Sequence, residues 1–386
     1  MIEKISIVSM ASISALGRNS KEVWAHYLND EPTFIEQSFD KFSALVSPIK
    51  KENWSVIEKM RREDMHYEDL DPSVLLAIYV SRMAVDQTDW NNKEFGINIG
   101  SSRGATSLFE KYYDEFKRNS LGKVSTLSSP TTTLGNISSW IGHDLQTKGP
   151  TISHSIACST ALHGVLNGIA WINSGMSKRF LVGGSEASNT PFTLAQMRAL
   201  KIYAFKNSKY PCKTLDFGKK KNTMIIGEGA SVFCLEKGEN QKALAIIEGI
   251  GYATEPLKHN ISISTNADCF QSTMKMAMKG IDKKEVDIIV MHAPGTIKGD
   301  ISEYNAIKKI FGDAHPAITS NKWKIGHTLG ASGGFSLEMA ILMMQNQKFI
   351  GVPFLSNDIQ PSKINKVMVN SVGFGGNAVS ILLSLA

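Results

Sequence analysis

Long apolar runs are missing from this chain of 386 residues. No segment approaches the roughly 20 consecutive apolar residues of a membrane-spanning helix. The first eight residues include an acid and lack the long apolar core of a signal peptide. We therefore expect a soluble protein that has no membrane span and stays in the cytoplasm.

Cysteine is also scarce. The four cysteines lie far apart, without CxxC or Cys/His ligand spacing, at Cys158, Cys212, Cys234 and Cys269. This pattern argues against both a disulfide framework and a zinc site. Each cysteine is therefore judged by its own setting, and that of Cys234, inside an apolar segment, predicts strand packing.

Charge is limited too, with a formal net charge of +6. The densest basic run, Lys219 to Lys221, is too short and too poor in neighbouring aromatics to suggest a nucleic-acid site, and we interpret it as a solvated loop. Further basic residues precede this run and leave open an acidic partner on one side of the molecule. They are Arg198, Lys201, Lys206, Lys209 and Lys213.

Short apolar, β-branched segments alternate with helical patterns along the chain, which indicates an α/β fold. The expected strands are 5–8, 95–99, 151–156, 180–182, 230–235, 286–291, 367–369 and 379–383. The expected helices include 161–172, which has one apolar face, and 337–344, which is almost wholly apolar and therefore expected to be buried.

The two halves of the chain resemble each other weakly. In the first half, an expected strand leads to Cys158 and into a helix, and in the second, residues 317–320 lead through His327 into another helix. A structural duplication is one interpretation, although α/β proteins repeat this unit by default. The polar, basic segment 206–222 is the best candidate for a boundary on composition.

Cys158 lies where an expected strand runs into an expected helix. A thiol in the first turn of a helix faces free amide groups and the positive end of the macrodipole, which favour its ionised form. This setting makes Cys158 a candidate nucleophile, although most free cysteines are simply small buried apolar residues.

Two histidines occupy glycine-containing loops beside expected strands. His292 ends an apolar strand, and the carboxyl ends of such strands are where open α/β sheets bind ligands. His327 lies at a helix start among glycines, where a ligand can come close. A structural role is the more common one for a lone histidine, and no third ligand lies at metal-binding spacing.

A last motif, Gly373-Phe374-Gly375-Gly376, connects two expected strands. It fits a tight hairpin, and equally a loop whose amides face a reacting oxygen and whose aromatic ring gates a pocket. Spacing alone does not separate these interpretations.

Taken in order, these motifs resemble those of the β-ketoacyl-acyl carrier protein synthases of fatty acid and polyketide synthesis, in the Cys-His-His branch. The resemblance covers nearly the whole chain, over segments 157–161, 182–187, 227–230, 292–303, 322–333 and 373–376. It implies an α/β, thiolase-like fold with a duplicated α-β-α-β-α arrangement of five layers. The halves would span residues 1–236, with Cys158, and 237–386, with both histidines.

The resemblance also implies the chemistry, a decarboxylative Claisen condensation. An acyl group would move from the phosphopantetheine of an acyl carrier protein to Cys158, and malonyl-acyl carrier protein would then lose carbon dioxide and attack it. His292 and His327 would donate hydrogen bonds to the malonyl thioester oxygen. The amides of Cys158 and Phe374 would form an oxyanion hole. The loop from Gly373 to Gly375, which carries Phe374, would gate the pocket.

Supporting roles follow from the same resemblance. Lys322 would pair with Glu303 and hold the histidine loops, Asp300 would support the structure, and Thr296 would contact pantetheine. The carrier brings the thioester, so no bound cofactor or metal is implied. The partners implied are the carrier protein and a second chain, in a homodimer with an interface strand near 151–156 or in a heterodimer with a sister subunit, but no nucleic acid.

Departures from the family pattern narrow the function. The chain has Ala293-Pro294-Gly295 where the family usually has Gly-Thr-Ser, Asn222 in place of a glycine, and Ile325 in place of a threonine. These point to a dedicated fatty acid, polyketide or polyene pigment pathway, with chain length set near Leu108 and residues 130–135. Two alternatives stay open: a non-catalytic partner like a chain-length factor, against which Cys158 argues, and a thiolase-like enzyme primed by coenzyme A.

Overall fold

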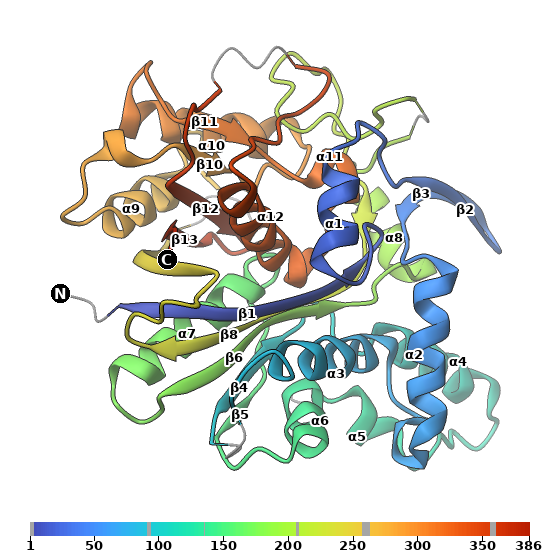
Figure 1. Cartoon of the computed structure of the whole chain (residues 1–386). Helices are drawn as coiled ribbons and strands as arrows, with labels where there is room; N and C mark the ends of the chain where they lie inside the picture. Colours follow the sequence, from blue (N-terminus) through green and yellow to red (C-terminus); the bar gives the residue numbers. More distant parts are fainter. Residues whose placement is uncertain (1–3, 91–93, 135, 206–207, 257–262, 356–359) are drawn as a thin grey trace.

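A computed structural model of the chain describes residues 4–90, 94–134, 136–205, 208–256, 263–355 and 360–386. Two five-stranded mixed sheets form its centre (Figure 1). The first has the order β1 (Ile5–Ser14), β8 (Gly229–Lys237), β6 (Arg179–Glu186), β4 (Gly96–Gly100), β5 (Thr151–Ile152). The second has the order β9 (Ala245–Thr254), β13 (Asn377–Ser384), β12 (Lys366–Val372), β10 (Ile288–Val290), β11 (Ala317–Thr319).

The two sheets repeat one topology. In each, the first three strands listed pair antiparallel and the last three pair parallel. β5 and β11 thus occupy equivalent edges. This repeat, and the layers below, confirm the predicted duplicated α/β arrangement.

Helices lie between and outside the sheets. The elements are α1 (Ser20–Tyr27), α2 (Lys51–Glu63), α3 (Pro72–Val85), α4 (Thr106–Arg118), α5 (Ser128–Thr132), α6 (Asn136–Leu145), α7 (Thr160–Asn173), α8 (Pro191–Ala199), α9 (Asp268–Ala277), α10 (Ile297–Phe311), α11 (Lys322–Ile325) and α12 (Ser332–Asn346). A small third sheet joins β2 (Ile35–Phe39), β3 (Phe42–Ser47) and β7 (Ile226–Gly227). Three short 3₁₀ turns span Met65–Tyr67, Lys283–Glu285 and Leu329–Ala331.

The apolar core follows five layers. One buried cluster joins α7 and α12 to the inner faces of both sheets. A second joins α2, α3 and α6 to the outer face of the first sheet, and a third joins α9 and α10 to that of the second. α12 is apolar nearly all round because it lies in the middle layer, as its sequence predicted.

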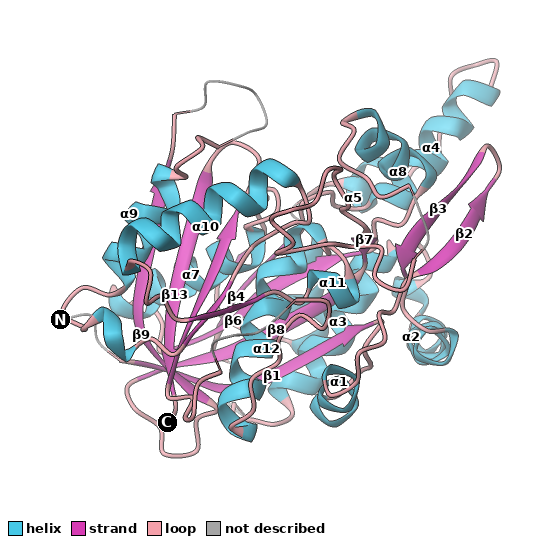
Figure 2. Ribbon diagram, turned by 90° about the horizontal axis from the view of Figure 1, so that it is seen from above, coloured by secondary structure: helices cyan, strands magenta, loops and turns pink. Residues whose placement is uncertain are grey.

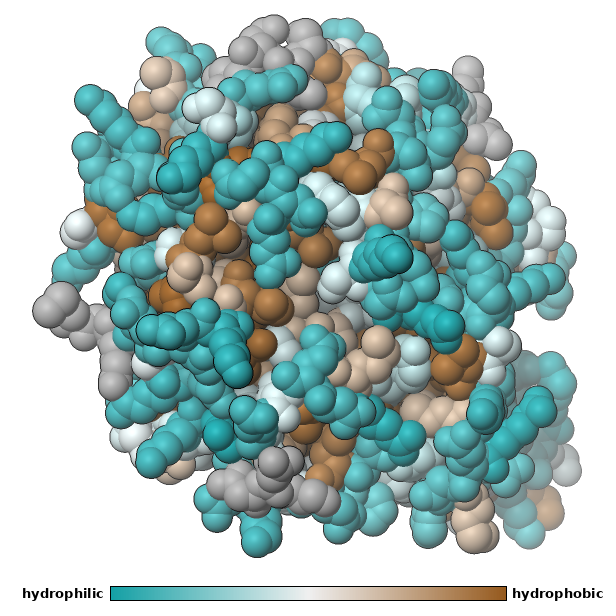
Figure 3. All heavy atoms as spheres, in the orientation of Figure 1, coloured by the Kyte–Doolittle hydropathy of each residue, from teal (hydrophilic) through white to brown (hydrophobic). Residues whose placement is uncertain are grey.

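The periphery is more polar. Figure 2 shows the β2–β3 hairpin and α4 at the same end of the molecule, away from α9 and α10. Hydrophilic side chains cover most of the face drawn in Figure 3, with apolar ones scattered between them. None of the described helices is long and apolar enough to cross a membrane.

Two expectations about the chain need correction. The predicted strand 151–156 ends at Ile152, because the residues that follow it leave the sheet and form the bend before α7. Segment 206–222 is no boundary between halves, since the strand β8 that follows it is the second strand of the first sheet. Lys206 lies outside the described residues.

Candidate active site

A tight turn holds Cys158 just before α7. Ala157 adopts a left-handed φ of 44°, and the amide N–H groups of Ser159 and Thr160 donate to the carbonyls of Ile156 (3.1 Å) and Ala157 (3.2 Å). A left-handed alanine costs about 1 to 3 kcal/mol, so the surrounding structure must enforce it. We predicted that Cys158 lies within the first turn of the helix. α7 begins only at Thr160, so Cys158 precedes that turn.

The thiol of Cys158 is harder to ionise than its position suggested. Burial raises its pKa to about 12, and the nearby Glu186 carboxylate adds to the effect, while the Lys322 ammonium opposes it. The helix start therefore does not by itself generate a thiolate.

His292 lies in the loop between β10 and α10. The backbone N–H groups of His292 and Ala293 donate to the two carboxylate oxygens of Glu303, at 3.0 and 2.9 Å. The Asn370 amide donates to the same carboxylate at 3.1 Å. Glu303 thus fixes the backbone that carries His292, and its side chain is fully committed to that loop and to β12.

His327 follows a glycine that the backbone requires. Gly326 has a φ of 71°, and a Cβ there would lie 2.7 Å from the carbonyl oxygen of Ile225. The Leu329 N–H donates to Nδ1 of His327 at 3.2 Å, which leaves the proton of the neutral ring on Nε2. The rings of His292 and His327 meet edge to face, with centroids 5.2 Å apart.

Both imidazoles are held neutral. Burial, reinforced by the Lys322 ammonium, keeps the pKa of His292 and of His327 well below the usual value. Each ring at neutral pH therefore has one N–H to donate and no charge.

Lys322 does not form the predicted direct pair with Glu303. Its ammonium is buried and has no hydrogen-bond partner among the described residues. Glu303 is occupied by two backbone N–H groups and an amide, so the two groups interact only through space. Burial lowers the pKa of Lys322 to about 8, although the nearby Glu303 carboxylate opposes this shift. Burial also raises the pKa of Glu303 to about 7.

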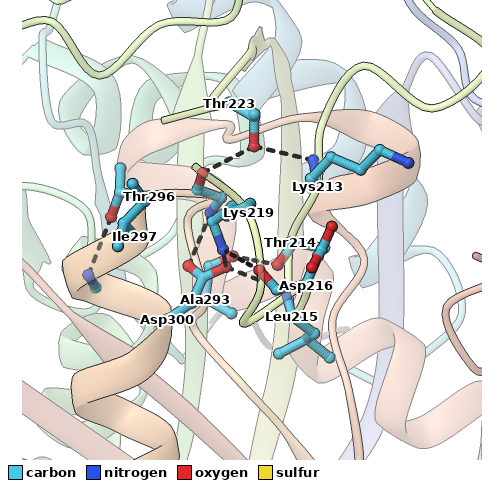
Figure 4. Close-up of polar contacts among 12 residues, drawn as sticks. Lys213, Thr214, Leu215, Asp216, Lys219, Thr223, Ala293, Thr296, Ile297 and Asp300 are labelled. Atoms are coloured by element: carbon cyan, nitrogen blue, oxygen red, sulfur yellow. Dashed lines mark hydrogen bonds and ion pairs between the residues drawn. The ribbon is translucent and has the colours of Figure 1, made fainter. Parts of the chain in front are cut away.

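Asp300 connects the loop 213–219 to the loop 293–296 that precedes α10 (Figure 4). One carboxylate oxygen accepts the Gly295 N–H at 3.0 Å, and the other accepts the Leu215 N–H at 3.0 Å and the Lys219 ammonium at 2.7 Å. Lys219 is therefore buried and paired, so our interpretation of the whole run 219–221 as solvated was wrong for its first residue.

Thr296 caps the N-terminus of α10. Its hydroxyl accepts the Gly299 N–H at 3.1 Å, and the Ile297 N–H donates to the Asn222 side chain at 2.9 Å. A hydroxyl that accepts one bond still has its own hydrogen to donate.

The glycine-rich tail is a hairpin that also touches the nucleophile turn. It joins β12 to β13, and a Cβ on Gly373 would lie 2.5 Å from the Ile156 carbonyl oxygen. The Ser371 hydroxyl donates to the Cys158 carbonyl at 3.2 Å. Gly375 has a φ of 107°, and Phe374 is 43% exposed. Both interpretations of this motif are therefore compatible with its position.

One cavity of about 220 Å³ brings these groups together. Cys158, His292 and His327 all line it, from four different segments of the chain once Phe374 is included. The remaining lining residues are Met197, Ile202, Asn222, Met224, Ile263, Phe270, Pro294, Thr296, Lys298, Gly299, Leu329, Val372 and Gly373. Leu108 and residues 130–134 are not among them, and Gly135 lies outside the described residues.

Comparison with known proteins decides the family. Residues 2–241 match the model of the β-ketoacyl synthase N-terminal domain, and residues 244–353 match that of the C-terminal domain. The chain belongs to the β-ketoacyl synthase family. The predicted family, the thiolase-like fold and the assignment as an acyltransferase of the β-ketoacyl synthase type are thereby confirmed.

Relatives of this β-ketoacyl synthase share its full length. The 3-oxoacyl-[acyl-carrier-protein] synthase 2 of Coxiella burnetii is 26% identical over 99% of this chain and 98% of its own. A type II PKS ketosynthase solved in complex with its acyl-carrier protein superposes with a TM-score of 0.85 at 17% identity, over the whole of both chains. A ketosynthase in complex with its chain length factor, from Xenorhabdus doucetiae, gives 0.83 at 21% identity over 100% and 98%.

Sequence reasoning missed part of this synthase's site. The apolar wall of the cavity comes from Met197, Ile202, Met224 and Leu329, which no motif marks because they meet only through tertiary packing. Glu186 was quoted as part of a matching segment but given no role. It is buried and accepts the N–H groups of Ser102 and of Gly330 (3.1 Å) on one oxygen, while the other has no described partner.

Proposed function

We propose that this β-ketoacyl synthase condenses an acyl group held on Cys158 with malonyl-acyl carrier protein, releasing carbon dioxide. The observation that carries the proposal is the single cavity shared by Cys158, His292 and His327. A buried thiol beside two neutral imidazoles suits both halves of such a reaction.

In the first half, the sulfur of Cys158 attacks the acyl thioester carbon, and the carrier leaves as its phosphopantetheine thiol. The proton of Cys158 moves to that departing sulfur, so the step needs no net charge separation. The amides of Cys158 and Phe374 donate no backbone hydrogen bond within the described part of the chain, which leaves them available to the oxyanion. Gly373 allows this approach of the two loops, because a Cβ there would clash with the Ile156 carbonyl oxygen.

In the second half, the malonyl group loses carbon dioxide, and negative charge moves onto its thioester oxygen. His292 and His327 donate hydrogen bonds to that oxygen, which is why their neutral, protonated-at-one-nitrogen state matters. The carbanion carbon then attacks the acyl carbon, the bond to the Cys158 sulfur breaks with its electrons on sulfur, and the thiolate that leaves takes up a proton from solvent to restore the thiol.

Lys322, Glu303, Asp300 and Thr296 support this site. Glu303 and Asp300 fix the loop of His292, and Lys322 adds a buried positive field. Thr296 has a hydroxyl hydrogen left for the pantetheine arm, which would bring the substrate without a cofactor bound by the protein.

The partners we propose are an acyl carrier protein and a second chain. β5 is a short edge strand, and several large apolar side chains on α4 are exposed. A second chain, in a homodimer or in a heterodimer with a sister subunit, would cover such surfaces. The halves 1–236 and 237–386, the cytoplasmic location and a dedicated fatty acid, polyketide or polyene pathway stay predictions. Cys158 weighs against a purely non-catalytic, chain-length-factor-like role.

The test is acylation of purified protein by acyl-carrier protein, followed by malonyl-carrier protein, with mass spectrometry of Cys158 and of the product. We expect an acyl adduct that disappears as a β-ketoacyl product forms. If neither an adduct nor a product forms, the non-catalytic partner role is favoured instead. Efficient priming by acyl-coenzyme A without any carrier would favour the thiolase-like alternative.

A further inference from the structure

Lys298 is the only residue with a fixed charge among those that line the described cavity. The other lining residues are apolar, neutral polar, or histidines held uncharged. Lys298 is exposed, so it stands at the mouth while His292 and His327 lie deep. A single cation at the entrance of an otherwise uncharged pocket points to an anionic group on whatever enters.

The backbone around Lys298 favours the same kind of group. Lys298 is the second residue of α10, whose start Figure 4 shows at Thr296 and Ile297. The N–H of Ile297 is taken by Asn222 and that of Gly299 by Thr296, whereas that of Lys298 donates no backbone hydrogen bond within the described chain. Its side-chain cation, its free amide and the positive helix end therefore coincide.

The neighbouring surface limits where the anion sits. Lys298 and Ile263 also line a second, outer cleft of about 490 Å³, which contains Glu255 and Asp268. Two carboxylates there disfavour an anion. The anion therefore belongs on the Thr296 side of Lys298, at the mouth of the catalytic cavity.

We propose that Lys298 binds the phosphate of the carrier's phosphopantetheine arm and so positions the thioester above Cys158. The inference rests on the proposed function. The malonyl carboxylate is the less suitable anion, because a cation beside it would stabilise the state that must lose carbon dioxide. Pro294, which offers neither hydroxyl nor N–H on this wall, leaves few other polar contacts for the arm.

The test compares three donors of one acyl group: the acyl-carrier protein, acyl-phosphopantetheine and acyl-pantetheine. The rate of Cys158 acylation is followed by intact mass spectrometry for wild type, Lys298→Gln, Lys298→Arg and Lys309→Gln. Lys309 is an exposed lysine on the same helix, far from the cavity, and so controls for the change in net charge.

We expect Lys298→Gln to react about 10-fold more slowly with both phosphorylated donors and normally with acyl-pantetheine. Lys298→Arg should keep most of the wild-type rate, and Lys309→Gln all of it. An equal loss with all three donors, or no loss with any, would overturn the proposal. A loss with the carrier protein alone would also overturn it, because Lys298 would then contact an acidic side chain of the carrier.

Failure of the proposed function looks different. If wild type is acylated by none of the donors, the condensing activity itself is in doubt. If wild type is acylated and the Lys298 variants behave as Lys309→Gln does, the proposed phosphate contact is wrong while the proposed function stands.

Discussion

The two halves of the molecule hold their reactive groups by different means. In the first half, Cys158 is positioned by tight backbone turns around a left-handed Ala157 and by neutral hydroxyl groups, one of them from Ser371. In the second half, His292 and its loop are positioned by buried carboxylates, Glu303 and Asp300. Cys158 follows the edge strand β5, whose counterpart β11 precedes His327, whereas His292 follows β10, the counterpart of β4.

The difference matches what each group would do in the proposed reaction. In the proposed reaction the thiol attacks a carbonyl carbon and later leaves it, and a turn held by neutral groups places its sulfur. In the proposed reaction both histidines stay neutral, and Glu303 fixes the backbone of the His292 loop without taking a ring nitrogen. The backbone of His327 is held instead by backbone hydrogen bonds with Ile225 and Gly227. Substitutions in the first half should therefore act on acyl transfer, and those in the second on decarboxylation or stability.

The largest effect is expected for Cys158→Ala. The variant has no sulfur to accept an acyl group, so no adduct should form, whereas decarboxylation of malonyl-carrier protein should continue on the intact histidine half. Mass spectrometry of the protein and release of carbon dioxide measure the two activities separately. A variant that still condenses normally would remove Cys158 from the mechanism.

Asp300→Ala should have the next largest effect, on stability. It leaves the Lys219 ammonium buried without its partner, which typically costs about 3 to 5 kcal/mol of unfolding free energy. Urea denaturation measures the loss, and Lys219→Met added to Asp300→Ala should recover much of it. Asp313→Ala removes an exposed pair with Lys308 and serves as the control, with nearly unchanged stability. Equal values for Asp300→Ala and the control would show that this half does not depend on its buried carboxylates.

His327→Ala should reverse the pattern of Cys158→Ala. Loss of one hydrogen-bond donor to a developing oxyanion costs about 10²- to 10³-fold, so decarboxylation should fall by that factor while Cys158 is still acylated. His327→Asn, which keeps an N–H, should restore part of the rate. If both variants of His327 decarboxylate malonyl-carrier protein at the wild-type rate, His292 alone supports the decarboxylation.

The sequence indicated the strands and the candidate site residues more clearly than the way these residues are held. Ordered motifs marked Cys158, His292 and His327 as candidates, because such signals are local, and all three line one cavity. The burial of Lys219, the missing contact between Lys322 and Glu303, and the raised pKa of Cys158 depend on which distant segments meet. No spacing rule encodes them. The wall formed by Met197 and Met224 escaped for the same reason.

Ala157→Gly should have the smallest effect, and it tests the turn that carries Cys158 most directly. Glycine accepts the left-handed φ of 44° without the penalty of about 1 to 2 kcal/mol for other residues, but it also loses more entropy on folding. The net result should be a gain of up to about 1 kcal/mol in unfolding free energy. Ala170→Gly, at an exposed helical position of α7, should instead lose about 1 kcal/mol. If Ala157→Gly gains stability but slows acylation, the turn trades stability for the placement of the Cys158 sulfur. Equal losses at both positions would mean that the left-handed turn is not strained.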